Sequence, residues 1–169
     1  MRISDVKVFC HFCGTALTRK YIEGRQRLYC TSCNRPIYEN PIPATCVIVF
    51  SAERQLLLVK RSVEPKKGQW CLPGGFIELG EDPKTGALRE LAEETGLRAP
   101  CATLLGVRTT PSPLYHSVLM VAYAVEKFSG VPAPGDDAEE TRWFSLSELP
   151  AIAFDSHRYF IERYLRDHA

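Results

Sequence analysis

The segment from Gly75 to Leu97 constrains the fold of this chain more strongly than any other. Asp82 can cap a helix with its side chain, and Pro83 suits a first turn, where the backbone N–H has no partner. Gly96 suits the left-handed residue that ends a helix. Apolar residues return between these marks at three- and four-residue spacing, which predicts a buried helix face formed by Leu88, Leu91, Ala92 and Thr95.

Three carboxylates crowd the same predicted helix. Glu90, Glu93 and Glu94 fall within one turn of each other, on the side away from the apolar residues. Like charges at this spacing cost a helix roughly 0.2–0.5 kcal/mol per pair, and only Arg89 compensates locally. A hard divalent cation prefers oxygen ligands, and glycines at positions 74 and 75 let the backbone approach a ligand closely. A metal site is therefore favoured, with a solvated acidic face as the alternative.

The spacing of these residues resembles a known motif. Gly75 is followed after five residues by Glu81, and after seven more by the run Arg89–Leu97 (RELAEETGL). The segment is similar to the Nudix box, G-x5-E-x7-R-E-U-x-E-E-x-G-U, in which U is aliphatic. The resemblance implies an α/β fold, the Nudix α/β/α sandwich around a mixed sheet. It also implies a hydrolase that uses Mg²⁺ or Mn²⁺ to cleave the phosphoanhydride of a nucleoside diphosphate linked to another group.

The resemblance gives the residues of the box their expected roles. The expected metal ligands are Gly75 through its carbonyl, Glu81 directly or through water, Glu90, Glu93 and Glu94. Glu93 is alternatively a proton acceptor, and Arg89 orients the glutamates through an ion pair. Glu90, Glu93, Glu94 and Arg89 are thus the expected catalytic residues. A bound divalent ion withdraws charge from the diphosphate and lowers the pKa of bound water.

Residues outside the box are weaker candidates. The acidic run 136–140 follows a Gly/Pro-containing loop, so Glu139 or Glu140 is a possible general base, with a solvated loop as the alternative. Arg61 precedes the Gly–Gly turn and could contact phosphate, and Tyr115 could contact a base or ribose. Each has an ordinary surface role as its alternative.

Two cysteine pairs mark the first forty residues. Cys10-x-x-Cys13 and Cys30-x-x-Cys33 are separated by sixteen residues, the spacing of a four-cysteine zinc site. A hairpin is expected between them, with Glu23 and Gly24 at its tip, and the whole resembles a zinc ribbon. Such a short segment buries little core, so a structural Zn²⁺ is favoured over reduced, unliganded thiols or a redox pair.

These features predict three parts: a zinc ribbon over residues 1–40, a linker over 41–43 and a Nudix hydrolase domain over 44–169. Strands are expected at 45–50, 55–61, 70–72, 101–109, 117–125 and 140–144, with a Pro-rich loop at 110–116 and a final helix at 155–168. The first two strands could pair as a hairpin. Cys46, Cys71 and Cys101 are expected to be buried thiols.

Composition limits the partners. A formal net charge of +1 gives no attraction to nucleic acid or to an anionic membrane, so neither is expected as a partner. No apolar run is long enough for a signal peptide or a spanning helix. A cytoplasmic protein with a small nucleotide substrate is expected, and a homodimer is left open.

The resemblance narrows the substrate. A zinc ribbon before a Nudix domain is similar to the NADH pyrophosphatases, which carry S-Q-P-W-P-F-P-x-S beyond the box; here Arg108–Leu114 reads RTTPSPL. Pro113, sixteen positions after Leu97, resembles the ADP-ribose pyrophosphatase subgroup. ADP-ribose or FAD is therefore the expected substrate and AMP the expected product. The alternatives are an NADH pyrophosphatase, a nucleoside triphosphate pyrophosphohydrolase, or a non-enzymatic module for ligand sensing or nucleic-acid binding that uses the basic residues of the ribbon.

Overall fold

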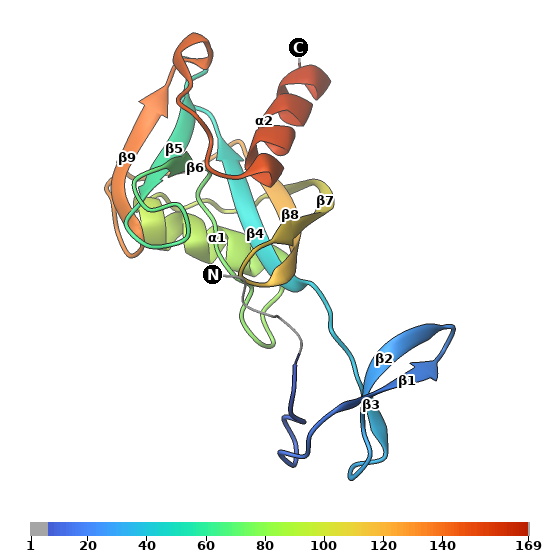
Figure 1. The fold of residues 1–169 in the computed structure, drawn as a ribbon. Helices are drawn as coiled ribbons and strands as arrows, with labels where there is room; N and C mark the ends of the chain where they lie inside the picture. Colours follow the sequence, from blue (N-terminus) through green and yellow to red (C-terminus); the bar gives the residue numbers. More distant parts are fainter. Residues whose placement is uncertain (1–6, 169) are drawn as a thin grey trace. The chain divides into compact units, whose positions relative to one another are not determined.

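The chain divides into two compact units that meet between Pro41 and Ile42. The computed structural model describes residues 7–168. The larger unit contains β4 (Ile42–Val49), β5 (Leu56–Arg61), β6 (Trp70–Cys71), α1 (Pro83–Thr95), β7 (Thr103–Ser112), β8 (His116–Val125), β9 (Ala138–Phe144), the 3₁₀ turn η1 (Leu146–Glu148) and α2 (Asp155–Asp167) (Figure 1). Within the described residues, neither helix combines the length and the apolarity needed to cross a bilayer.

Strand β4 lies at the centre of the larger unit. It pairs in parallel with β8, which pairs antiparallel with β7, so this sheet is mixed. A second sheet has the order β6-β5-β9 and is antiparallel. The expected hairpin of the first two strands is wrong. Strand β4 forms its hydrogen-bonded ladder with β8 instead. Only the isolated antiparallel bridge between Phe50 and Leu56 connects the end of β4 to β5.

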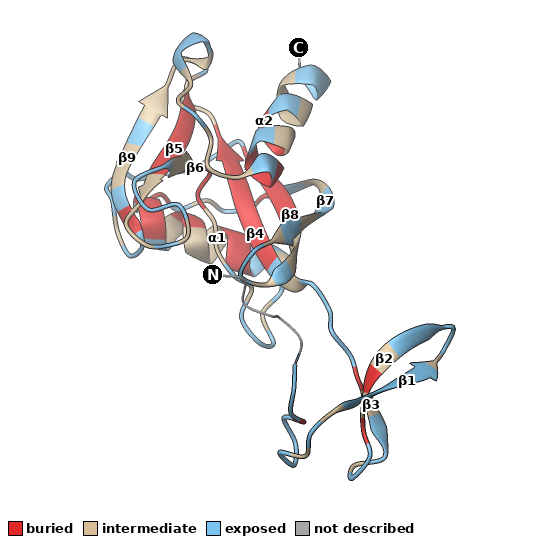
Figure 2. Cartoon of the chain, in the orientation of Figure 1, coloured by how far each residue is buried: buried red, intermediate tan, exposed pale blue. Residues whose placement is uncertain are grey.

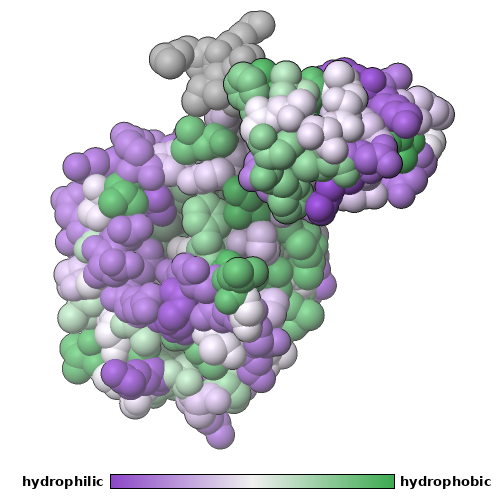
Figure 3. Space-filling view, turned by 90° about the horizontal axis from the view of Figure 1, so that it is seen from below, coloured by the Kyte–Doolittle hydropathy of each residue, from purple (hydrophilic) through white to green (hydrophobic). Residues whose placement is uncertain are grey.

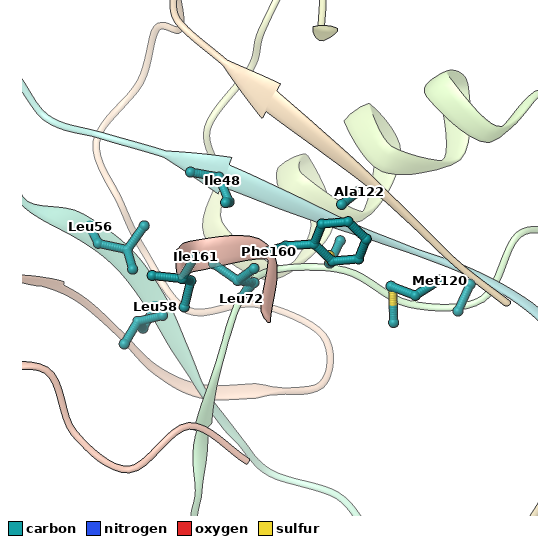
Figure 4. Packing of buried hydrophobic residues seen from close by; sticks show 10 residues of the cluster. Ile48, Leu56, Leu58, Leu72, Met120, Ala122, Phe160 and Ile161 are labelled. Atoms are coloured by element: carbon teal, nitrogen blue, oxygen red, sulfur yellow. The ribbon is translucent and has the colours of Figure 1, made fainter. Parts of the chain in front are cut away.

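The core has two faces because β4 and β5 are buried on both sides. Alternate residues of these strands, Cys46, Ile48, Leu56 and Leu58, pack with Phe160 and Ile161 of α2 (Figure 4). The residues between them, Val47, Val49 and Leu57, pack with Ala87 and Leu91 of α1. The buried strands therefore run between two helices (Figure 2), which confirms the α/β/α sandwich around a mixed sheet.

Helix α1 has the ends that its sequence predicts. The Asp82 side chain accepts a hydrogen bond from the Lys84 amide at 2.9 Å, and Gly96 closes the helix with a φ of 72°. The buried face differs from the expectation in one important respect. Leu91 and Thr95 are buried, but so is Glu94, whereas Leu88 and Ala92 are only partly covered. One of the three crowded carboxylates thus belongs to the interior.

Three smaller expectations also differ from the structure. Strand β4 begins earlier than the expected strand 45–50, since Ile42 and Pro43 already lie in register with Val118 and Leu119. The Pro-rich loop is shorter than expected, because β7 continues to Ser112 and β8 begins at His116. Cys46 and Cys71 are buried as expected, but Cys101 is exposed because it precedes β7.

The smaller unit is a three-stranded antiparallel sheet of β1 (Thr18–Ile22), β2 (Arg25–Cys30) and β3 (Arg35–Ile37). Glu23 and Gly24 both have positive φ at the tip of the β1–β2 hairpin, as in a type I′ turn. Its buried residues are few: Cys10, Leu28, Cys30 and Ile37 form the core cluster. So small a core needs a covalent or metal staple to be stable.

Candidate metal and catalytic site

The Gly–Gly turn is fixed between β4 and α1. The Thr45 amide donates to the Gly75 carbonyl and the Val47 amide to the Pro73 carbonyl, both at 2.8 Å. A Cβ on Gly74 would lie 2.2 Å from the Thr45 carbonyl oxygen, so only glycine fits there. The Gly74 amide donates to Glu94 Oε2 at 2.9 Å.

Arg89 is the centre of a carboxylate network on α1. Its guanidinium donates to Glu81 through Nε at 2.8 Å and through Nη2 at 3.0 Å. Its Nη1 donates to Glu90 and to Glu93, each at 2.8 Å, and Nη2 also reaches the Phe76 carbonyl. Three of the four glutamates of the box therefore share one cation, and Arg89 lowers the pKa of Glu81 to about 2.

Two glycines make room for two of these carboxylates. A Cβ on Gly75 would lie 2.6 Å from the Glu90 carboxylate, and a Cβ on Gly86 would lie 2.8 Å from Glu81 Oε2. Either distance is too short for a real contact. The small residues at these positions are thus needed where the carboxylates fold back against the backbone.

Glu94 differs from its neighbours because it is 4% exposed and lies outside the Arg89 network. Burial raises its pKa to about 8, and the negative charge of Glu90 adds to the rise, while the Gly74 hydrogen bond opposes it. Burial likewise raises the pKa of Glu90. A divalent cation would favour the charged form of both carboxylates, so the donor set fits such an ion.

The loop before β9 donates hydrogen bonds to the last backbone carbonyls of α1. The Ala133 amide donates to the Thr95 carbonyl at 2.9 Å, and the Gly135 amide to the Glu94 carbonyl at 3.2 Å. This places Asp136 and Asp137 close enough for their charges to raise the pKa of Glu90 and Glu94 respectively. The sequence shows the acidic run, but only the fold shows that Asp136 and Asp137, its first two members, act on the glutamates of the box.

Two of the weaker candidates, Glu139 and Glu140, pair outside the box, whereas the other two, Arg61 and Tyr115, have neighbours within it. Glu139 pairs with Lys60 at 3.1 Å, and Glu140 pairs with Arg142, so neither joins the Arg89 network. The charge of Arg61 lowers the pKa of Glu94, while its Nε donates to the Pro65 carbonyl at 2.7 Å and its guanidinium lies 5.3 Å from the centre of the Phe154 ring. Tyr115 packs edge-on against Phe76, whose carbonyl Arg89 binds.

Four thiols converge in the smaller unit. The possible ligand atoms of Cys10, Cys13, Cys30 and Cys33 all lie within 4.8 Å of one another; among residues 7–168 no other such group of three or more was found. The Sγ atoms are 3.9 Å apart between Cys10 and Cys33, and 3.5 Å apart between Cys13 and Cys30. Tetrahedral zinc with bonds of about 2.3 Å separates its sulfurs by about 3.8 Å, so the cluster has the dimensions of a metal site.

Comparison with known proteins agrees with this geometry. The NUDIX domain model matches residues 40–164. The chain is 39% identical to an ADP-ribose pyrophosphatase of Methanocaldococcus jannaschii over 132 residues, 77% of this chain and 76% of that protein. It is 32% identical to the NAD-capped RNA hydrolase NudC of Pseudomonas aeruginosa over 158 residues, which cover 91% of this chain but only 55% of the relative. A crystal structure of a NUDIX hydrolase from Nitrosomonas europaea superposes with a TM-score of 0.71 at 28% identity, covering 95% of this chain and 92% of that one.

The chain therefore belongs to the Nudix family, as a hydrolase that acts on phosphoanhydrides. It spans about half the length of its NudC relatives.

Proposed function

We propose that the protein hydrolyses the phosphoanhydride of ADP-ribose or FAD with Mg²⁺ or Mn²⁺ and releases AMP. One structural observation carries the proposal: a buried Glu94 and a partly buried Glu90 stand one helical turn apart beside the Gly74–Gly75 turn. The named activity of the relative from Methanocaldococcus jannaschii supports ADP-ribose, because the alignment covers about three quarters of both chains.

Glu90 and Glu94 are the residues that would hold the ion, with Glu93 and the Gly75 carbonyl as further oxygen donors. Glu90 and Glu93 each give one oxygen to Arg89 and keep the other for a second partner. The ion would neutralise charge on the diphosphate and lower the pKa of a bound water. Glu93 is also our first candidate for the proton acceptor, because it is the more exposed of the three.

Glu81 has a different proposed role. Both of its oxygens accept hydrogen bonds from Arg89, and Oε2 also accepts the Glu78 amide at 3.0 Å. We therefore assign it to hold Arg89 in place, with any contact to the ion passing through water. Arg89 in turn holds Glu90 and Glu93 in their rotamers, so the pair positions the metal ligands.

We propose that the four cysteines of the smaller unit bind one structural Zn²⁺. Four thiolates complete a tetrahedral shell and leave no position for a catalytic water. The tight turns at Gly14 and Asn34, both with positive φ, follow the second cysteine of each pair and bend the chain back toward the cluster.

A second candidate is hydrolysis of NADH or of an NAD-linked RNA end. The NudC alignment favours it, because coverage of 91% of this chain must include Cys30 and Cys33 of the smaller unit, whereas coverage of 77% can leave out all four cysteines. The sequence RTTPSPL at 108–114 opposes it, since the NADH pyrophosphatase motif is missing there.

One experiment separates these candidates. ADP-ribose, FAD, NADH, NAD-capped RNA and nucleoside triphosphates are compared at equal concentration with Mg²⁺, and products are resolved by chromatography. Fastest release of AMP from ADP-ribose or FAD supports the proposal. Faster turnover of NADH or capped RNA favours the second candidate, and release of pyrophosphate from triphosphates contradicts both.

We also propose a cellular location and an oligomeric state for the protein. A cytoplasmic location fits seven cysteines that form no disulfide with one another, because a reducing compartment keeps them reduced. A homodimer stays a prediction, and gel filtration with light scattering measures it.

A further inference from the structure

The near-zero net charge of the chain hides an uneven distribution. Residues 1–41 contain seven Lys or Arg and three Asp or Glu, which gives a net charge of +4. Residues 42–169 contain 14 basic and 17 acidic residues, which gives −3. Such opposite signs in two parts of one chain are typical of a basic part that meets a polyanion.

The β1–β2–β3 sheet sorts its residues onto two faces. Residues that pair directly across a sheet share a face, and successive residues alternate. Leu28, Cys30 and Ile37 are therefore on one face, where they are buried with the cysteine cluster. The pairs Lys20 with Arg27 and Thr18 with Tyr29 belong to the opposite face.

Cations and tyrosines lie side by side on that opposite face. The Lys20 ammonium lies 4.6 Å from the centre of the Tyr29 ring, and the Arg27 guanidinium lies 4.8 Å from that of Tyr38. Arg25 is on the same face, because it is two residues from Arg27 on β2, and it is exposed. We call the set Lys20, Arg25, Arg27, Tyr29 and Tyr38 the cation–tyrosine face.

The face is open to a ligand. Tyr38 is 47% exposed, so its ring can be reached from solvent. Glu23 is the acidic residue found against the face, where it pairs with Arg27 at 2.9 Å and accepts from the Tyr38 hydroxyl at 3.3 Å. Lys20 and Arg25 have no carboxylate partner among the described residues. In the space-filling view the hydrophobic residues of the smaller unit gather mainly on one side and the hydrophilic residues on the other (Figure 3).

We propose that the cation–tyrosine face binds single-stranded nucleic acid. Unpaired bases stack on aromatic rings, and neighbouring lysine and arginine side chains take the phosphates, which is the arrangement of a sequence-tolerant single-strand site. A membrane surface would instead be met by a continuous apolar stripe with cations at its border. On this face three cations stand beside two tyrosines, and two of the cations lie over tyrosine rings. The inference goes beyond the proposed hydrolysis and does not depend on it.

The test uses the full-length protein and a 5′-fluorescein-labelled U20 RNA, with the dT20 DNA and a U20–A20 duplex as further probes. Binding is followed by fluorescence anisotropy at 50 and 200 mM salt without added Mg²⁺. Two variants probe the face: Lys20→Gln/Arg25→Gln and Tyr38→Leu. Lys127→Gln/Arg166→Gln, two exposed cations of the larger unit, is the control of equal charge.

The proposal predicts a distinct result for each arm. Wild type and control bind U20 and dT20 more tightly than the duplex, with strong salt dependence. The double variant binds at least about tenfold more weakly at 50 mM salt, and its salt slope is smaller by about 1.4, which is about 0.7 per lost phosphate contact. Tyr38→Leu binds at least about fivefold more weakly with an unchanged slope, because it removes stacking and no charge.

Other results overturn the proposal. They are absence of U20 binding by the wild type, an equal loss in the control, or unchanged binding by both face variants with wild-type zinc content. Equal affinity for the U20–A20 duplex and for U20 would also overturn it, because bases in a duplex cannot stack on the tyrosines. Binding to phosphatidylserine vesicles without binding to U20 assigns the face to a membrane instead. Zinc content measured on each variant shows whether the smaller unit remains folded, and Arg25→Gln alone is the milder variant if it does not.

Discussion

Arg89 binds both oxygens of Glu81 in a two-bond fork, Nε to Oε1 at 2.8 Å and Nη2 to Oε2 at 3.0 Å. Lysine keeps the charge but cannot form this fork, since its ammonium is a point charge on a flexible stem. We predict that Arg89→Lys weakens metal binding by about 10- to 100-fold, the usual cost of losing a partner that orients metal ligands. Mg²⁺ titrations of the hydrolysis rate check this. Arg98→Lys, at an exposed arginine just after α1, is the control, and equal behaviour of the two variants would refute the positioning role.

Substitution of Gly86 should change activity and stability in different directions. Alanine there favours the helix by roughly 0.5–1 kcal/mol, yet its Cβ would displace the Glu81 carboxylate, which lies 2.8 Å away at the end of a flexible side chain. We predict that Gly86→Ala leaves the free energy of unfolding equal or higher and lowers kcat/KM. Urea unfolding and steady-state kinetics on the same preparation measure both. A variant with full activity would show that Glu81 need not occupy its present position.

The local part of the site could be predicted from the sequence, and the long-range part could not. The ends of α1 follow from Asp82, Pro83 and Gly96, whose effects are confined to one helical turn. The burial of Glu94 depends on the Gly74 amide, twenty positions earlier, and no periodicity within the helix contains that contact. The same limit applies to Asp136 and Asp137, whose charges raise the pKa of Glu90 and Glu94 because the 133–135 backbone binds the end of α1.

The fold shows the same division between local and distant pairing. The β1–β2 hairpin was predictable because Glu23 and Gly24 fix its turn. The parallel pairing of β4 with β8 joins Ile42 to Val118, and only the Nudix resemblance indicated a mixed sheet in advance. Cys101 was expected to be buried from its apolar neighbours, but its exposure is set by where β7 begins.

His157 should make the stability of the larger unit depend on pH. It is 3% exposed, its Nδ1 accepts the Leu72 amide at 3.1 Å, and burial lowers its pKa to about 3. The unfolded state binds this proton near pH 6.5 while the folded state does not, so stability falls as pH decreases below that value. We predict a loss of about 2 kcal/mol from this residue between pH 7 and pH 5.

The measurement compares urea unfolding of wild type and His157→Gln at the two pH values. Glutamine keeps an acceptor for the Leu72 amide but does not titrate, so the variant should lose less stability over this interval. Other titrating groups contribute equally to both proteins. Equal losses would show that His157 is not the group responsible.

The four-cysteine cluster should hold one zinc ion that stabilises the smaller unit and does not affect the larger one. We predict that Cys13→Ser lowers the zinc content below one per chain and removes hydrogen-exchange protection from β1–β3. Hydrolysis should remain, because the box residues all belong to the larger unit. Metal analysis by mass spectrometry and exchange mapping check this. Cys101→Ser, at an exposed cysteine outside the cluster, is the control and should keep its zinc.

The measurement that tests the central claim most directly is the position of a divalent cation in crystals soaked with Mn²⁺ and a non-hydrolysable ADP-ribose analogue. We predict an anomalous peak within coordination distance of the Glu90 and Glu94 carboxylates and next to the diphosphate, and its loss in Glu94→Gln. A peak held elsewhere, with both carboxylates turned away from it, would contradict the account.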